Sequence, residues 1–249
     1  MAHYQIILAY DGTEFSGFQR QGMIRTVQLV FESALVTLGW QGHSILAAGR
    51  TDVGVHATGQ VVSFELNWAH SPDALKKALN ANLPEDVAVR EVCETDESFH
   101  PRYDACSRTY QYRIYCQPQR APLIQRYAWR VWPPVELSTL QMAASLLPGK
   151  HDFSAFGTPP RPNGSTVRTI YQADWKEQNG CLVFEVTADA FLYHMVRRMV
   201  YLQVMAAREK ISLEDLSLAV QEARKQMPGL APPNGLTLAV VKYKTGKKN

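Results

Sequence analysis

Stretches in which apolar and polar residues alternate recur along this chain, and stretches with helical periodicity separate them. Residues 3–10 alternate up to the turn signal Asp11-Gly12, and Thr26 then precedes apolar residues spaced as on one face of a helix. Residues 62–66 alternate again, and Ser71-Pro72 reads as an N-cap followed by proline, which predicts a helix to about Asn80. The first half is therefore expected to contain two strand–helix units.

The second half adds signals for antiparallel pairing. Asn179-Gly180 lies between two alternating runs, near 167–177 and 181–187, and this pattern predicts a β-hairpin. Ser212 with Asp215 three residues later predicts a helix start. Strands that can pair antiparallel and are covered by helices predict an α+β fold. The other expected elements are strands around Val87 to Val89, over Arg108 to Cys116 and over Leu236 to Tyr243, and helices from Ser138 to Pro148 and from Phe191 to about Glu209.

Residues 118–134 are rich in proline, arginine and aromatic side chains, which indicates a crossing segment between two halves. We therefore expect an N-terminal half at 1–117 and a C-terminal half at 118–249. A chain of 249 residues, 46% hydrophobic and 20% charged, has enough apolar side chains for one large or two modest cores. This composition excludes a disordered or fibrous protein. Residues 242–248 are expected to form a solvated basic end.

Four cysteines occur without a Cys-x-x-Cys pair and without a histidine at zinc-finger spacing. A metal site or a disulfide framework is therefore not expected, and reduced thiols in a cytoplasm fit this pattern best. The N-terminal residues lack a basic stretch followed by an apolar core, and no uncharged apolar run reaches about 18 residues. These patterns predict neither export nor a membrane span.

The formal net charge is only +3, so a polyanionic partner would have to be met by local arginines rather than by the whole surface. Arginine side chains match phosphate geometry, and tyrosine rings stack on unpaired bases, so this mixture suits single-stranded or looped RNA. Solvated surface charge and core tyrosines are the alternative interpretation. The arginines that lie in predicted loops or on helix faces are Arg20, Arg25, Arg50, Arg102, Arg108, Arg161, Arg168, Arg197 and Arg198.

The segment Gly49-Arg50-Thr51-Asp52-Val53-Gly54-Val55-His56-Ala57 places one acid between an arginine and a run of small residues. Its two glycines permit a tight or left-handed backbone and the close approach of another molecule. The pattern therefore predicts a turn that displays a single reactive carboxylate. The alternative is an ordinary connection in which Arg50 and Asp52 form a surface ion pair worth at most ~1 kcal/mol.

Several other chemistries lack their motifs. His151-Asp152 is not accompanied by the further ligands that a metal phosphohydrolase needs. The chain has no His-x-Glu followed by Pro-Cys-x-x-Cys, which disfavours a zinc nucleobase deaminase. Phosphate-binding loops, dinucleotide fingerprints and serine-nucleophile elbows are also missing from the sequence. Nucleotide hydrolysis, hydride transfer and serine acyl transfer therefore have no support.

A series of motifs in fixed order resembles a known family. It begins with Tyr10-Asp11-Gly12-Thr13, continues through Arg25-Thr26-Val27-Gln28 and the segment 49–57, and includes Arg108-Thr109-Tyr110 and His194-Met195-Val196-Arg197 near the other end. Together these motifs resemble the TruA-type tRNA pseudouridine synthases over nearly the whole chain. The chain departs from the family pattern at Phe18, Pro101 and Tyr201, where the family usually has tryptophan, alanine and glycine.

The resemblance implies the pseudouridine synthase α+β fold, with two related halves that share a mostly antiparallel sheet around a basic central cleft. It implies a homodimer that works without cofactor or metal and converts uridine to pseudouridine at positions 38–40 of the tRNA anticodon stem-loop. Asp52 matches the catalytic aspartate, Arg50 the residue that fills the space of the extruded base, and Tyr110 the residue that stacks on the uracil. Arg197 matches a partner of Asp52. The stretches implied to bind RNA are Phe99, His100, Pro101, Arg102 and Tyr103, with Arg168.

Two other functions stay open at this point. The first is a catalytically silent RNA-binding protein, which would be expected to lack the acid that Asp52 supplies. The second is a hydrolase that cuts the glycosidic bond without rejoining it, and such enzymes normally use two carboxylates.

Overall fold

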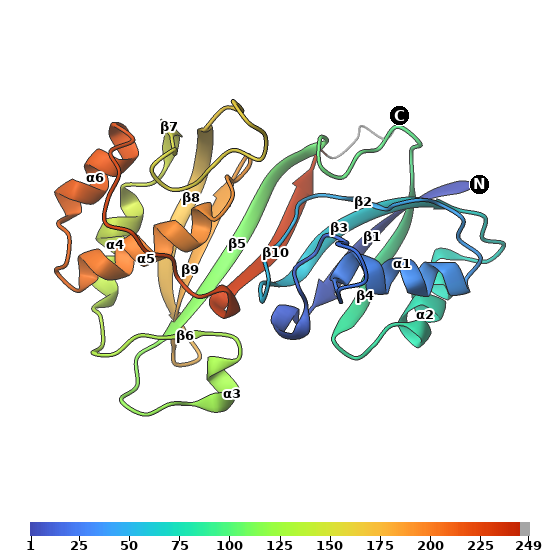
Figure 1. Cartoon of the computed structure of the whole chain (residues 1–249), viewed down its shortest axis with the longest axis horizontal. Helices are drawn as coiled ribbons and strands as arrows, with labels where there is room; N and C mark the ends of the chain where they lie inside the picture. The colour runs from blue at the N-terminus through green and yellow to red at the C-terminus, as the bar shows by residue number, and fades with distance from the viewer. Residues whose placement is uncertain (245–249) are drawn as a thin grey trace. The chain divides into compact units, whose positions relative to one another are not determined.

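The computed structural model describes residues 1–244, and it divides into two compact units (Figure 1). Among the described residues, the first unit comprises 1–106 and 237–244, and the second comprises Ser107–Leu236. Residues 245–249 lie outside the described part, so the expected basic end is described only up to residue 244. The fold is α+β, as the sequence predicts.

The first unit contains a sheet in the order β4-β1-β3-β10. Strand β1 (Ala2–Tyr10) pairs antiparallel with both β3 (His56–Leu66) and β4 (Val87–Thr95). Strand β10 (Leu236–Tyr243) pairs parallel with β3, and the short β2 (Leu46–Ala47) pairs with β3 on the way into the loop that carries Asp52. The predicted strands of this half are confirmed.

Two helices of the first unit start where the sequence predicts. Helix α1 (Val27–Thr37) is capped by Thr26, whose hydroxyl accepts from the Leu29 amide, and α2 (Pro72–Asn82) is capped by Ser71. Figure 1 shows both helices beside the sheet of this unit, and they pack against each other. A single 3₁₀ turn, η1 (Gly12–Glu14), follows β1. The buried side chains include Tyr4, Ile6, Leu8, Phe31, Leu35, Leu75 and Leu79.

The sheet of the second unit has the order β5-β9-β8-β7. Strands β5 (Ala105–Tyr115), β9 (Cys181–Ala188), β8 (Val167–Gln178) and β7 (Gly149–Asp152) pair antiparallel in turn, and β6 (Trp129–Arg130) pairs parallel with β5. The predicted hairpin is confirmed: Asn179 and Gly180 have φ of 51° and 72°, which are the positive values of a type I′ turn.

Helices α4 (Leu137–Ser145), α5 (Met195–Ala207) and α6 (Leu213–Gln221) pack against one another, and α3 (Pro122–Gln125) is a single turn. The predicted capping box of Ser212 and Asp215 opens α6. Helix α5 begins later than the expected Phe191, because His194 is left-handed and the preceding Tyr193 pairs with Thr158. A short 3₁₀ turn, η2 (Pro233–Gly235), leads into β10.

The boundary between the units differs from the expected one at 117/118. Strand β5 belongs to the second unit because it pairs with β9 from Arg108 to Ile114, and β10 brings the chain back to the first unit by pairing with β3. Tyr110 therefore belongs to the second unit, whereas Asp52 belongs to the first. Among residues 1–244, no helix is both long and apolar enough to cross a membrane.

Candidate active site

Asp52 lies in the loop between β2 and β3, and Thr51 and Val55 on either side of it are more deeply buried than Asp52 is. Thr51 and Val55 are buried, Asp52 is half-buried and Val53 is exposed. Asp52 is therefore partly exposed, while Thr51 before it and Val55 after it are buried. The sequence prediction of an acid displayed in a turn is consistent with this geometry.

The residue before Asp52 is held by the chain that follows β1. The Thr51 carbonyl accepts from the Phe18 amide at 3.1 Å, and the Thr51 hydroxyl lies 2.7 Å from the Tyr10 hydroxyl in a buried contact. Gly17, with φ of 85°, brings its backbone so close that a Cβ there would lie 3.1 Å from the Thr51 oxygen. Glycine is needed at position 17 because of both that φ and this contact.

The residues after Asp52 are held by the same region. The Val55 amide donates to the Asp52 carbonyl at 3.2 Å, and Gly54 supplies the positive φ, 75°, that such a turn requires. Gly12 packs directly on this turn, because a Cβ at Gly12 would overlap with the Val55 carbonyl. The Gly12 amide donates to His56 Nδ1 at 3.0 Å.

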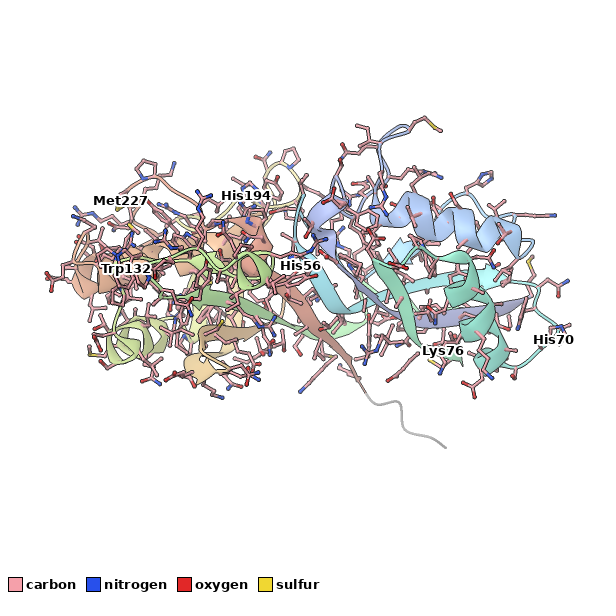
Figure 2. All side chains as sticks on the ribbon, turned by 90° about the horizontal axis from the view of Figure 1, so that it is seen from below. His56, His70, Lys76, Trp132, His194 and Met227 are labelled. Atoms are coloured by element: carbon pink, nitrogen blue, oxygen red, sulfur yellow. The ribbon has the colours of Figure 1, made fainter. Side chains whose placement is uncertain are left out.

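His56, labelled in Figure 2, is buried. One of its ring nitrogens contacts two groups. Its Nδ1 lies 3.0 Å from the Gly12 amide nitrogen and 3.1 Å from Asp11 Oδ1. One nitrogen cannot accept from the amide and donate to the carboxylate at the same time. The Gly12 amide is buried and needs an acceptor, so we assign Nδ1 as the acceptor and the ring proton to Nε2. Asp11 Oδ1 accepts instead from the Thr13 amide and hydroxyl, at 3.0 and 2.6 Å.

Arg50 is exposed, and it takes part in none of the ion pairs found within residues 1–244. The alternative of a surface ion pair between Arg50 and Asp52 is therefore not what the structure contains. Gly49 is not left-handed, and no described atom outside its chain neighbours lies within 4 Å of a Cβ built there. Of the two glycines in this segment, Gly54 alone uses the left-handed backbone.

Other arginines singled out in the sequence stabilise the first unit. Arg20 donates to Glu32 at 2.7 Å, and Arg25 pairs with Asp86 at 2.9 Å. The Arg25 guanidinium also lies 4.1 Å from the centre of the Phe15 ring. For these two arginines, the interpretation as structural charge explains the observed contacts.

In the second unit, Tyr110 lies on β5 opposite Val186 of β9. Its half-buried ring meets the ring of Phe191 edge-on, with centroids 5.1 Å apart and planes at 85°. Edge-to-face packing fixes the ring plane while leaving part of the ring uncovered. Tyr110 therefore has the shape and support that a stacking platform requires.

Arg197 and Arg198, in the first turns of α5, both bind the segment that precedes η2. Arg197 Nε donates to the Ala231 carbonyl at 2.8 Å, and Arg198 donates to the carbonyls of Gln226 and Gly229 at 3.0 and 2.8 Å. His194 and Met227, labelled in Figure 2, lie on the same side of this unit. These contacts set the direction of the Arg197 guanidinium before any substrate binds.

Two tyrosines also contact the segment that Arg197 and Arg198 bind. The Tyr112 hydroxyl donates to the Pro232 carbonyl at 2.7 Å, and burial raises the pKa of Tyr112, so it stays a neutral donor. Tyr201, one of the departures from the family pattern, packs on Gly229, where a Cβ would overlap with its ring. Gly229 has φ of 145° and makes room for this tyrosine.

The segment 99–103 forms a compact turn in the first unit. His100 Nδ1 accepts from the Arg102 amide at 3.1 Å, and the His100 amide donates to Asp104 at 2.7 Å. The Tyr243 hydroxyl donates to the Pro101 carbonyl at 2.8 Å, and the ring of Phe99 packs on that of Tyr243. Tyr103 remains 65% exposed with the Arg102 guanidinium 6.0 Å from its ring centre. The turn thus presents a cation beside an aromatic ring.

Arg168, at the start of β8, turns back onto its own loop. Its Nη1 donates to the carbonyls of Ser165 and Val167 at 2.9 and 2.6 Å. Burial lowers the pKa of Arg168, and the nearby Asp189 carboxylate partly offsets that effect. A role for Arg168 in binding RNA stays a prediction.

Within residues 1–244, no group of three or more histidine, cysteine, aspartate or glutamate side chains has a geometry suited to a metal ion. His151 Nε2 contacts the Pro148 carbonyl, and Asp152 accepts from the Ser154 amide at 2.9 Å. All four cysteines lie in the described part and are free thiols.

Comparison with known proteins identifies the family. The family model described as tRNA pseudouridine synthase matches residues 6–104 and 143–244. The chain is 40% identical to tRNA pseudouridine synthase A of Pseudothermotoga lettingae, over 98% of this chain and 100% of that protein. It is 38% identical to the protein of the same name from a Geobacillus strain, over 95% and 96% of the two chains. This chain belongs to the tRNA pseudouridine synthase family.

As a tRNA pseudouridine synthase, the protein is an isomerase whose substrate is tRNA, and the family resemblance seen in the sequence is confirmed. The matched ranges contain Arg50, Asp52 and Arg197, whereas Tyr110 lies in the stretch between them.

Sequence reasoning missed the residues that hold the Asp52 loop of this tRNA pseudouridine synthase. Tyr10, Gly12, Gly17 and His56 occur inside the quoted motifs, but they were given no role of their own. The available signal was their position: Tyr10 ends the first predicted strand, Gly12 lies in the turn signal after it, and His56 lies near the end of the segment around Asp52.

Proposed function

We propose that this enzyme converts uridine to pseudouridine at positions 38–40 of the tRNA anticodon stem-loop, with Asp52 as the catalytic carboxylate. The observation that supports this assignment most is the Asp52 loop, in which a half-exposed acid is flanked by the anchored residues Thr51 and Val55. An acid displayed in this way is arranged for chemistry rather than for structural stability.

The reaction breaks the bond from N1 of uracil to C1′ of the ribose and forms a bond from C5 to C1′. The C5 proton is lost and N1 gains a proton, so the product is an isomer of the substrate. A carboxylate has three available roles: attack on the sugar carbon, addition to the base, or removal of a ribose proton. Each role requires Asp52 to be ionised and within reach of the nucleoside.

The uridine has to leave the helical stack, which costs a few kcal/mol. We assign the exposed Arg50 to the space that the base vacates, and the Tyr110 ring to stacking on the uracil. The Tyr110 hydroxyl is the proposed acceptor of the C5 proton. Arg197 is the proposed cation that keeps Asp52 ionised, since a nearby positive charge lowers the pKa of a carboxylate.

The proposed RNA contacts outside the reaction centre are Phe99 to Tyr103 and Arg168. Support comes from the Arg102 and Tyr103 pair, because a guanidinium and an exposed ring suit a phosphate and an unpaired base. We propose that the enzyme is a cytoplasmic homodimer that requires neither cofactor nor metal.

Mapping modified uridines with a carbodiimide reagent after incubation with tRNA tests this function. We expect pseudouridine at positions 38, 39 and 40, and no signal in a transcript with cytidine at these three positions. Unchanged uridine would support a silent RNA-binding protein, and an abasic site would support a glycosidic-bond hydrolase. Pseudouridine elsewhere in the tRNA would contradict the assigned positions.

Two substitutions at Tyr110 separate stacking from proton transfer. Tyr110→Ala removes the ring and is expected to weaken binding of the target base by ~1 to 3 kcal/mol, seen as a higher KM. Tyr110→Phe keeps the ring and removes the hydroxyl, so KM should stay near the wild-type value while kcat falls by about 10²-fold or more. A fully active Phe variant would show that the phenol is not the base.

A further inference from the structure

We propose that Tyr10 and His56 are positioning residues for Asp52: they hold the backbone on its two sides and thereby set where its carboxylate meets the nucleoside. The proposal rests on the proposed catalytic role of Asp52. Both residues are buried, at 4% and 5% exposure, and both act through a residue other than Asp52. They belong to the first unit, as Asp52 does.

Two sets of contacts hold the backbone beside Asp52, and we call them the Tyr10 arm and the His56 arm. The Tyr10 arm acts through Thr51. The two hydroxyl oxygens lie 2.7 Å apart in a buried environment, and Thr51 directly precedes Asp52 in the chain. A hydrogen bond shielded from water has no competing solvent partner, so removal of either hydroxyl removes a contact that water does not replace. The Thr51 carbonyl is held separately by Phe18, which makes the Tyr10 contact the side-chain part of this anchor.

The His56 arm acts through Gly12. His56 Nδ1 accepts from the Gly12 amide at 3.0 Å, and Gly12 presses on the Val55 carbonyl. Val55 in turn donates to the Asp52 carbonyl at 3.2 Å. The histidine therefore fixes the turn from Asp52 to Val55 through a contact that reaches it from the end of β1.

The two arms start from one piece of chain. Tyr10 is the last residue of β1, and Gly12 is two residues beyond it. Because β1 is paired on both sides, with β3 and β4, its end is a rigid reference point for the loop. With both flanks fixed to that point, the remaining freedom of Asp52 is mainly that of its own side chain. Misplacement of a reacting group by about 1 Å costs about 10²-fold in rate, which is why such anchoring matters.

A double-mutant cycle tests the Tyr10 arm. Tyr10→Phe and Thr51→Val each remove one hydroxyl without changing the size of the side chain greatly, and Tyr4→Phe is the matched control. Tyr4 is a buried tyrosine on the same strand, away from the loop. We expect each single variant to lower kcat by about 10- to 100-fold with KM for tRNA unchanged, and the double variant to lose no more than the worse single variant. Tyr4→Phe should keep the wild-type kcat.

The His56 arm is tested by rescue. His56→Leu removes the ring nitrogens, whereas His56→Asn can place an amide oxygen near the position of Nδ1 and accept from Gly12. We expect the Asn variant to retain at least about 10-fold more kcat than the Leu variant at temperatures well below both unfolding transitions. A purely structural role would instead change the unfolding temperature and leave kcat of the folded enzyme intact. If the Leu variant does not fold, the Tyr10 and Thr51 cycle decides.

The outcomes separate this proposal from the assignment of Asp52. Inactive Asp52→Asn together with wild-type kcat for Tyr10→Phe, Thr51→Val and a folded His56→Leu would overturn the positioning role alone. An active Asp52→Asn variant would overturn the catalytic assignment, and the positioning proposal with it. Effects of Tyr10→Phe and Thr51→Val on kcat that simply multiply would show that the two hydroxyls act independently, which also contradicts the proposal.

Discussion

Replacement of Asp52 by asparagine is expected to abolish isomerisation while tRNA binding is largely preserved. Asparagine keeps the size of the side chain and its anchored neighbours, so the loop between Thr51 and Val55 should remain in place. It removes the negative charge that any of the three proposed roles requires. We expect kcat to fall by at least about 10³-fold, the scale seen when a nucleophile is removed from an enzyme.

Single-turnover formation of pseudouridine and the Kd for tRNA give the two measurements. The matched control is Asp73→Asn, which changes an acid at the exposed start of α2 and should leave both quantities unchanged. Turnover of Asp52→Asn at the normal rate would refute the assignment. Loss of turnover with an equal loss of tRNA binding would instead assign Asp52 to binding.

Gly12→Ala is expected to have the second largest effect, although position 12 carries no reactive group. A Cβ at this position would overlap with the Val55 carbonyl, so either η1 or the Asp52 loop has to move. The neighbour is backbone and cannot yield as a flexible side chain would. We expect a loss of about 1–3 kcal/mol in the free energy of unfolding, together with a fall in kcat of about 10²-fold.

Gly49→Ala is the control within the same loop. Gly49 is not left-handed, and the described atoms leave the position of its Cβ open. The free energy of unfolding of the alanine variant should therefore lie within about 0.5 kcal/mol of the wild-type value. Chemical denaturation of the two variants measures the difference. Equal stability and equal kcat for Gly12→Ala and the wild type would show that the close approach at Gly12 does not hold the loop.

The local elements of this fold follow from short-range chemistry. Thr26 and Ser71 cap helices where a side-chain oxygen precedes apolar periodicity, and Asn179-Gly180 forms the turn for which those residues are suited. The predicted start of α5 at Phe191 was wrong, because the pairing of Tyr193 with Thr158 is a contact between distant parts of the chain. The boundary between the units was likewise set by the pairing of β5 with β9, which no local pattern shows.

The candidate site likewise has some features that the local sequence shows and others that only the folded chain shows. Asp52 stands out in the sequence because an acid between an arginine and a glycine-rich turn is a local pattern, and the family resemblance adds its role. Arg25 and Arg20, by contrast, were equally good candidates for RNA contacts in the sequence, and their acid partners Asp86 and Glu32 appear only in the folded chain.

What the sequence determined by itself, then, are the α+β class, the helix caps, the hairpin and the presence of an acid in a glycine-rich turn, since each depends on residues close together in the chain. Only the tertiary structure decided how that acid is held. Tyr10 and Thr51 are 41 residues apart and Gly12 and His56 are 44 apart, and they meet because β1 pairs with β3. Strand pairing over such a separation depends on the packing of the whole unit, which short-range pattern does not encode.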